Sequence, residues 1–157
     1  MMLNIGTDAP EFKCINQKGK TIQLSDFVGK KIVVLYFYPK DFTPGCTAQA
    51  CSFRDEYEQF MEYGAEVIGI SADSEESHKK FAGNYSLPFH LCSDRDGTIR
   101  KSYKVPVGFL SIFFSRITYI IGLDGKIAWA YKSNLAPASH VSEALKIVEE
   151  LQLRNFQ

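Results

Sequence analysis

The stretch from Ile32 to Tyr38 constrains this chain most, because every residue in it is aliphatic or aromatic. A strand without polar alternation is buried on both faces, as the strands of parallel sheets are. Pro39 ends this strand. From about Pro44 to Tyr63, apolar residues recur at helical spacing between charged ones. A buried strand followed so closely by an amphipathic helix predicts an α/β fold, in which helices cover the sheet.

The remaining segments extend this pattern. Asp73 is expected to cap a helix, with Glu76 completing the capping box three residues later, and Asp124–Gly125 marks the strongest hairpin turn. The other expected elements are a small hairpin of 12–15 and 21–24, a strand at 66–72, a helix end near Gly83–Asn84, a strand at 89–92, a turn at Asp96–Gly97, strands at 116–123 and 126–131, and a helix that starts after Pro137. This order predicts a mixed sheet with helices on both faces and an N-terminal β-hairpin, the arrangement of a thioredoxin-like fold.

Composition narrows the class of protein. The 157 residues show no repeat and no compositional break, so we expect a single domain over residues 1–157. Eighteen Lys and Arg balance eighteen Asp and Glu, so we expect neither nucleic acid nor a membrane surface as a partner. The longest apolar run is far shorter than the roughly 20 residues of a membrane span. No secretory signal is recognised at the N-terminus, and we expect a cytoplasmic location.

The four cysteines are the informative part of this composition. They are Cys14, Cys46, Cys51 and Cys92. In a reducing compartment such residues are buried, metal-binding, catalytic or redox-sensing. The chain has no C-x-x-C pair, and its three histidines do not fall into ligand spacing with the cysteines, so we expect no metal site.

Cys46 falls in the first turn of the predicted helix, directly after the buried strand. Unpaired backbone N–H groups and the positive end of the helix dipole gather there, and both favour an anion. A thiol at this place is expected to be partly ionised at neutral pH and therefore nucleophilic. Pro44 suits the first turn, because its missing N–H would have no partner there, and the Thr43 hydroxyl can face the sulfur. The spacing predicts a reactive thiol without identifying the oxidant.

Cys51 follows five residues later on the same predicted helix. Helix geometry separates the Cα atoms of Cys46 and Cys51 by about 8.7 Å, more than the roughly 7 Å that a disulfide tolerates. If the two cysteines form a redox couple, the first turns of the helix must therefore unwind. The alternative is that both are small buried apolar side chains, as free cysteines often are.

The segment around Cys46 resembles the peroxiredoxin family. Pro39-x-x-x-Thr43-x-x-Cys46 matches the active-site motif of that family. The longer stretch from Tyr38 to Cys51, followed by Phe53-Arg54-Asp55, is similar to the peroxiredoxin Q (bacterioferritin comigratory protein) subgroup. The likeness covers nearly the whole chain and includes Gly6-x-x-Ala9-Pro10-x-Phe12, Ser71-Ala72-Asp73, Ser93-Asp94, and Arg116-x-Thr118 before Gly122-Leu123-Asp124-Gly125.

The resemblance implies a thiol-dependent peroxidase with a thioredoxin-like fold. Cys46 would be the peroxidatic cysteine, whose thiolate attacks the O–O bond of hydrogen peroxide or an alkyl hydroperoxide and becomes a sulfenic acid. Thr43 would hydrogen-bond the peroxide, Pro39 would shield the sulfur from water, and Arg116 would hold the thiolate. Cys51 would be the resolving cysteine of an intramolecular disulfide, which thioredoxin or a similar thiol reductant returns to two thiols. The resemblance implies no cofactor and no metal.

Three further residues are expected to line the substrate pocket. These are Phe42, Gly45 and Phe113, the last within the apolar stretch 109–114, which could favour organic hydroperoxides or a dimer contact. Gln49 stands where the subgroup often carries glutamate, and an amide cannot supply the negative charge of a carboxylate. Any role for a carboxylate at this position is therefore in doubt.

Alternatives remain at several positions. Cys14 and Cys92 are expected to serve packing, with Cys92 as a second candidate for the resolving cysteine. We expect His78, His90 and His140 at the surface or at helix starts rather than as catalytic bases, because an ionised thiol needs none. A general disulfide oxidoreductase is disfavoured by the lack of C-x-x-C, and a peroxide sensor or holdase that uses the same thiol is a rival function. We expect a monomer, with a weak dimer as the alternative.

Overall fold

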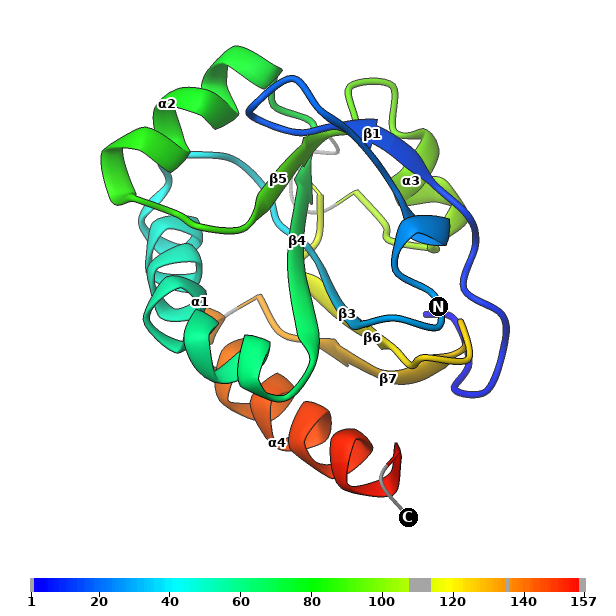
Figure 1. The fold of residues 1–157 in the computed structure, drawn as a ribbon. Coiled ribbons are helices and arrows are strands. Elements are labelled where there is room, and N and C mark those ends of the chain that lie inside the picture. The colour runs from blue at the N-terminus through cyan, green and yellow to red at the C-terminus, as the bar shows by residue number, and fades with distance from the viewer. Residues whose placement is uncertain (1, 108–113, 135, 156–157) are drawn as a thin grey trace.

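The centre of the computed structural model, which describes residues 2–107, 114–134 and 136–155, is a five-stranded mixed sheet (Figure 1). Its strands are β3 (Ile32–Phe37), β4 (Ala65–Ser71), β5 (His90–Ser93), β6 (Ile117–Ile121) and β7 (Ile127–Lys132). They lie in the order β5-β4-β3-β6-β7. β3 pairs parallel with β4 and antiparallel with β6, and β4 pairs parallel with β5. The strand predicted from Ile32 is thus the central one, and it is buried throughout.

Three helices contribute to the apolar core on one face of the sheet. They are α1 (Pro44–Glu62), α2 (Glu75–Tyr85) and α4 (Pro137–Asn155). Within this core the ring of Tyr36 on β3 stacks on Phe53 of α1, with centroids 4.6 Å apart. Gly69, the register partner of Tyr36 on β4, makes room for that ring, because a Cβ at position 69 would lie 2.8 Å from it. The stack fixes the middle of α1 to the centre of the sheet.

The opposite face is covered by the N-terminal hairpin and a short helix. β1 (Lys13–Ile15) and β2 (Thr21–Gln23) form a separate antiparallel sheet, a 3-10 turn follows at Leu24–Asp26, and α3 is Thr98–Ser102. Their apolar residues join the second core cluster. An isolated bridge between Asn16 and Cys92 links the hairpin to β5. The predicted mixed sheet, with helices on both faces and an N-terminal hairpin, is confirmed.

Helix boundaries differ from the prediction at α2. Its N-cap is Ser74 rather than Asp73, because the Ser74 hydroxyl accepts a hydrogen bond from the N–H of Ser77 at 3.1 Å. The Asp73 carboxylate serves other partners. The helix ends at Tyr85, one residue beyond the predicted Gly83–Asn84, and Ser86 follows as the C-cap in the left-handed conformation, with φ 52°. The prediction also omits α3, which has only five residues.

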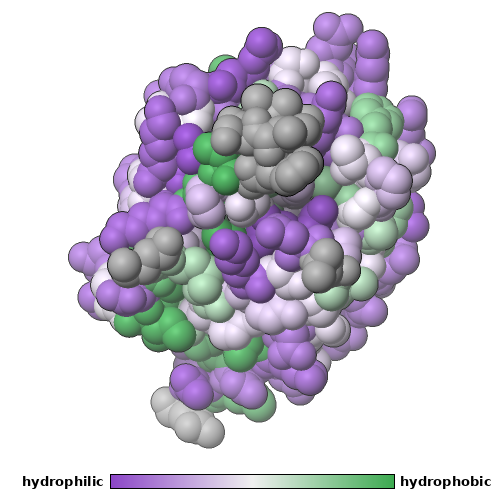
Figure 2. Space-filling model, turned by 180° about the vertical axis from the view of Figure 1, so that it is seen from behind, coloured by the Kyte–Doolittle hydropathy of each residue, from purple (hydrophilic) through white to green (hydrophobic). Residues whose placement is uncertain are grey.

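The surface is mostly hydrophilic on the face shown in Figure 2, where hydrophobic side chains form separate small groups. Large apolar residues with substantial exposure lie far apart in the sequence, among them Ile5, Met61 and Leu153. Single exposed apolar residues are normal on globular proteins. None of the helices in the described ranges is both long and apolar enough to cross a membrane.

Candidate active site

Cys46 lies in the first turn of α1, as predicted, and only 1% of its surface is exposed. Thr43 is the N-cap residue, and Pro44 is the first residue of the helix. The Thr43 hydroxyl does not cap the helix but donates to the carbonyl of Lys40 at 2.9 Å. The carbonyl of Thr43 accepts from the N–H of Thr47 at 2.8 Å. The helix start therefore keeps its positive potential close to the Cys46 thiol.

Arg116 lies directly before β6 and reaches the thiol across the start of α1. Its Nη2 donates to Cys46 Sγ at 3.5 Å, and its Nη1 donates to Oε1 of Gln49. Its backbone N–H donates to Oδ1 of Asn134 at 3.0 Å. Arg116 is 5% exposed, so water screens its charge little. A fixed cation within hydrogen-bond reach of a thiol favours the thiolate, which is the nucleophilic form.

Two donors of this group have no partner among the described residues. They are Nε of Arg116 and Nε2 of Gln49, and both are buried. An unpaired buried donor costs about 1–3 kcal/mol, so it is most readily understood where a ligand oxygen binds. Gln49 orients the guanidinium through its carbonyl oxygen, and its neutral amide adds no negative charge beside the thiol. The sequence left the role of this residue open.

Gly45 lies against the guanidinium of Arg116. A Cβ at position 45 would be 3.1 Å from Nη2 of Arg116 and 3.5 Å from Cγ of Pro137, the first residue of α4. The glycine is thus explained by the close approach of two side chains. A side chain at position 45 would therefore require the guanidinium or Pro137 to shift by a few tenths of an ångström.

His140 is fully buried in the first turn of α4, near Arg116. Its Nδ1 lies 2.8 Å from Oγ1 of Thr118, and its Nε2 lies 2.8 Å from the carbonyl of Ser133. Because a carbonyl only accepts, Nε2 carries the proton and Nδ1 accepts from the hydroxyl. Burial lowers the pKa of His140 to about 4. The hydrogen bond to the Ser133 carbonyl raises this pKa, and the positive charge of Arg116 lowers it further. The ring is therefore neutral at pH 7.

Cys51 lies on the same uninterrupted helix as Cys46, and both are free thiols. Cys51 is partly exposed, whereas Cys46 is buried. Two residues beyond Cys51, Phe53 is fully buried and stacked on Tyr36. This agrees with the expectation that the two sulfurs can bond only after the helix before Phe53 has unwound.

The other predicted site residues lie around this centre or outside the described ranges. Pro39 is partly buried between β3 and α1. Phe42 is 44% exposed, and its ring packs on α2 against Phe81, 5.0 Å away, and against Tyr85. These contacts direct Phe42 toward α2, and its place in a substrate pocket stays a prediction. Phe113 lies outside the described residues.

Cys14 and Cys92 form a second pair on the hairpin side of the sheet. Both are buried in the cluster formed by the hairpin, α3 and the sheet. A hydrogen bond with the Cys14 thiol, together with burial, raises the pKa of Cys92. A thiol that stays protonated in apolar surroundings is unreactive. The arrangement supports the packing role expected for both residues.

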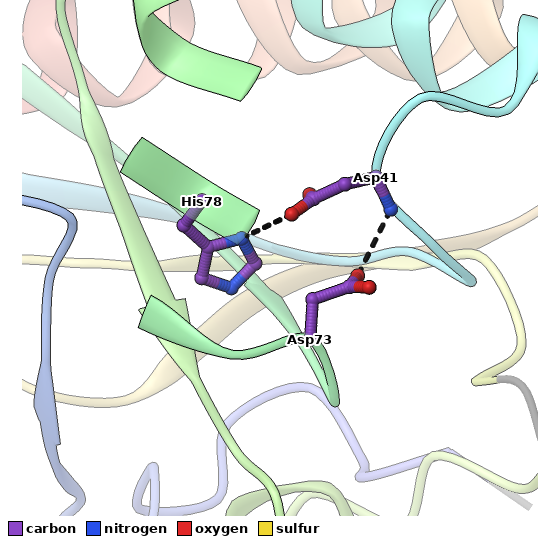
Figure 3. A group of neighbouring side chains, drawn as sticks. All are labelled: Asp41, Asp73 and His78. Atoms are coloured by element: carbon purple, nitrogen blue, oxygen red, sulfur yellow. Dashed lines mark hydrogen bonds and ion pairs between the residues drawn. The ribbon is translucent and has the colours of Figure 1, made fainter. Parts of the chain in front are cut away.

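Carboxylates and an imidazole gather behind the loop 39–43, where no metal site was expected. Asp41, Asp73 and His78 each offer a ligand atom within 4.8 Å of the others, which a metal ion could use (Figure 3). Oδ2 of Asp41 and Nδ1 of His78, however, already lie 2.8 Å apart in a direct hydrogen bond. His78 was expected at the surface or at a helix start. It lies in the first turns of α2 and is fully buried.

Comparison with known proteins agrees with this geometry. The AhpC/TSA family matches residues 5–130. Peroxiredoxin Q, chloroplastic, of Sedum lineare is 46% identical over 147 residues, which cover 94% of this chain and 78% of the relative. The protein of the same name from Triticum aestivum is 48% identical over 146 residues, covering 93% of this chain and 67% of the relative.

Solved structures give the same result. The crystal structure of peroxidoxin BcpB from Mycobacterium tuberculosis superposes with a TM-score of 0.88 at 32% identity, covering 95% of this chain and 98% of that one. The bacterioferritin comigratory protein of Xanthomonas campestris, described for its alkyl peroxide reduction activity, superposes with a TM-score of 0.85 at 25% identity, covering 95% and 99%. The chain therefore belongs to the AhpC/TSA family and, within it, to the peroxiredoxin Q group of thiol peroxidases, which act on hydroperoxides.

Proposed function

We propose that Cys46 is the peroxidatic cysteine of this thiol peroxidase and that Cys51 resolves its oxidised form. The observation that carries the proposal is the hydrogen bond of 3.5 Å from Arg116 Nη2 to Cys46 Sγ at the start of α1. Helix dipole and guanidinium act on the same buried sulfur, and both favour a thiolate. Within the described ranges, no arginine hydrogen-bonds the thiol of Cys14, Cys51 or Cys92.

The chemistry needs only the thiols and the hydroperoxide. The Cys46 thiolate attacks the terminal oxygen of the peroxide, the S–O bond forms, the O–O bond breaks, and an alcohol or water leaves. The sulfur is thereby oxidised by two electrons to a sulfenic acid. Arg116 stabilises the negative charge that moves onto the departing oxygen. The Cys51 thiol then attacks the sulfenic sulfur, the S–S bond forms and water leaves.

Recycling requires an external dithiol. We propose thioredoxin, or a protein of similar chemistry, which would reduce the Cys46–Cys51 disulfide by two successive exchange steps. Unwinding of the first turns of α1 would present the disulfide to this partner, because an intact helix keeps Cys46 buried. A cytoplasmic location and a monomeric state belong to the same proposal.

Steady-state peroxide consumption with thioredoxin and its reductase tests these assignments. Wild type should turn over many times, and Cys46→Ser should be inactive. Cys51→Ser should consume one equivalent of peroxide and then stop with thioredoxin as reductant. Equal activity in wild type and Cys51→Ser would show that another thiol resolves the sulfenic acid. Mass mapping of the oxidised protein would then show whether that thiol is Cys92.

The same assay separates the rival functions. A peroxide sensor or holdase that uses Cys46 would react once and would not turn over with thioredoxin. A general disulfide oxidoreductase would exchange disulfides without consuming peroxide. Light scattering on the reduced and oxidised protein would test the monomeric state.

A further inference from the structure

A buried hydrogen-bond cluster around Asp41 fixes the loop 39–43, which precedes α1 (Figure 3). The Asp41 carboxylate, on a residue 3% exposed, takes part in three hydrogen bonds. Tyr38 Oη donates to Oδ1 at 2.6 Å, while Ser77 Oγ and His78 Nδ1 each lie 2.8 Å from Oδ2. Tyr38 comes from the end of β3, and Ser77 and His78 come from α2. The carboxylate thus ties the loop to two separate elements.

The pair Asp41–His78 holds a proton between its two members. His78 Nε2 lies 3.2 Å from the carbonyl of Cys92, which can only accept, so Nε2 carries a hydrogen. A second proton must lie between Nδ1 and Oδ2 of Asp41, because two lone pairs would otherwise face each other at 2.8 Å. Loss of either side chain would leave the other buried with an unmet hydrogen bond.

The backbone of the loop is fixed at the same residue. The N–H of Asp41 donates to Oδ2 of Asp73 at 2.9 Å, and this oxygen also accepts from the Ser71 hydroxyl at 2.6 Å. The next residue, Phe42, has φ 67°, a conformation that a non-glycine residue keeps only when its surroundings enforce it. Two contacts enforce it here. The hydrogen bonds of Asp41 fix the backbone just before Phe42, and the ring of Phe81 packs against the Phe42 side chain.

The cluster joins the loop to the residue after β3 and to the start of α2. Thr43, the N-cap residue of α1, follows Asp41 by two residues, and Cys46 follows by five. Neither Asp41 nor His78 donates to or accepts from the Cys46 sulfur within the described ranges. The cluster therefore acts on that sulfur without a direct hydrogen bond, and the backbone from 41 to 46 is the shortest covalent link between them.

We propose that Asp41 and His78 are positioning residues for peroxide reduction, which hold the loop 39–43 and the first turn of α1 in the reactive conformation. This rests on the proposed roles of Cys46 and Cys51. The same cluster opposes the unwinding that a Cys46–Cys51 disulfide requires. It therefore acts in opposite directions on the two steps: it favours attack on the peroxide and slows formation of the disulfide.

Two rates measured on the same protein test this inference. Rapid quenching, alkylation and mass spectrometry would follow the loss of the Cys46 thiol after peroxide is added, and then the appearance of the Cys46–Cys51 disulfide. Asp41→Ala should slow thiol oxidation about tenfold, because the reacting groups are less well aligned. It should speed disulfide formation severalfold and reduce the yield of sulfinic acid at excess peroxide.

Asp94→Ala is the matched control. Asp94 is also 3% exposed, and its carboxylate accepts from the N–H groups of Ile99 and Arg100 at the start of α3. Its loss should destabilise the protein without changing the ratio of the two rates. Asp41→Asn should restore most of the wild-type ratio, because its amide can donate to an unprotonated His78 Nδ1 and its oxygen can accept from Tyr38.

The outcomes are distinct. Parallel losses in both rates of Asp41→Ala, or the same change of ratio in Asp94→Ala, would overturn the positioning role. A change of either rate after dialysis of wild type against a chelator would overturn it in favour of a metal at Asp41, Asp73 and His78. If Asp41→Ala does not fold, Ser77→Ala, which removes one donor, should shift the ratio in the same direction by a smaller factor. Failure of wild type itself to form the disulfide would instead contradict the proposed function.

Discussion

The two pairs of cysteines differ in every neighbour that decides thiol chemistry. Cys46 lies at a helix start beside the guanidinium of Arg116, on a helix shared with the partly exposed Cys51. Cys14 and Cys92 are free thiols within an apolar cluster, and a hydrogen bond between them together with burial raises the pKa of Cys92. Both Cys46 and Cys92 are almost completely buried, so burial by itself does not separate a reactive thiol from an unreactive one. The nearby charge does.

The largest expected difference is in reactivity toward an alkylating reagent. In the folded, reduced protein we expect iodoacetamide to modify Cys46 faster than Cys92 by roughly a thousandfold or more, because the thiolate is the nucleophile. Peptide mass mapping over time would measure both rates, with the urea-unfolded protein as the control in which they converge. Comparable rates in the folded protein would remove the contrast between the two pairs.

Replacement of the guanidinium tests the origin of that contrast. Arg116→Met should lower the second-order rate constant for peroxide reduction by about 10²–10³, the usual cost of removing one preorganised charge-stabilising donor. Arg95→Met, at an exposed arginine, should leave the rate unchanged. Stopped-flow measurement of peroxide consumption gives both values. A loss below threefold in Arg116→Met would assign the reactivity of Cys46 to the helix start alone.

Acid should lower the free energy of unfolding through protonation of His140. Its pKa is about 4 in the folded protein and 6.5 in a model peptide, so the unfolded chain binds the extra proton first as the pH falls. The stabilisation is complete above pH 6.5 and is lost between pH 6.5 and about 4, by up to about 3 kcal/mol. Urea unfolding across this range should show a shallower loss for His140→Gln than for wild type. Identical slopes would contradict a neutral buried His140.

Gly45→Ala should separate stability from activity. An added Cβ 3.1 Å from Arg116 Nη2 should displace the guanidinium and lower the rate of peroxide reduction about tenfold. The same change favours the helix by about 0.5–1 kcal/mol. Gly83→Ala in α2 is the control, because nothing lies within 4 Å of its added Cβ. That variant should gain stability at full activity, measured by urea unfolding and peroxide consumption.

The smallest expected change in rate is at the second pair. Cys92→Ala should leave the rate of peroxide reduction within about twofold of wild type, and it should lower the free energy of unfolding by about 1–2 kcal/mol through the lost contact with Cys14 and the cavity. Urea unfolding and the turnover assay would measure both. A large loss of turnover at full stability would make Cys92 part of the redox chemistry.

Local signals predicted the parts of the fold that local residues determine. β3 follows from an unbroken apolar run, and α1 follows from Pro44 and the helical spacing beyond it. The limits of α2 were less accurate, because Ser74 outcompetes the neighbouring Asp73 as cap. α3 was missed because it has only five residues, and the N–H groups of Ile99 and Arg100 are bound by Asp94, a side chain outside the helix.

The candidate site was predicted only as far as adjacent residues define it. The position of Cys46 follows from the strand and the helix that flank it. Arg116, 70 residues away, came from the family resemblance and not from spacing. His78 and Asp41 are 37 residues apart, and no short motif connects them, so their contact could be found only in the folded structure.

The stack of Phe53 on Tyr36 divides α1 into two parts that differ in how firmly they are held to the sheet. Residues 44–52 are free of that anchor, and the remainder is pinned to the central strand. Unwinding of the helix for the disulfide would therefore stop before Phe53. The conformational entropy gained on unwinding would come from the first turns only. Cys46 and Ala50 lie in this part and belong to the apolar core, so oxidation would change the packing at the start of α1, while the part beyond Phe53 would keep its contact with β3. A partner protein would therefore recognise the oxidised form at the start of α1.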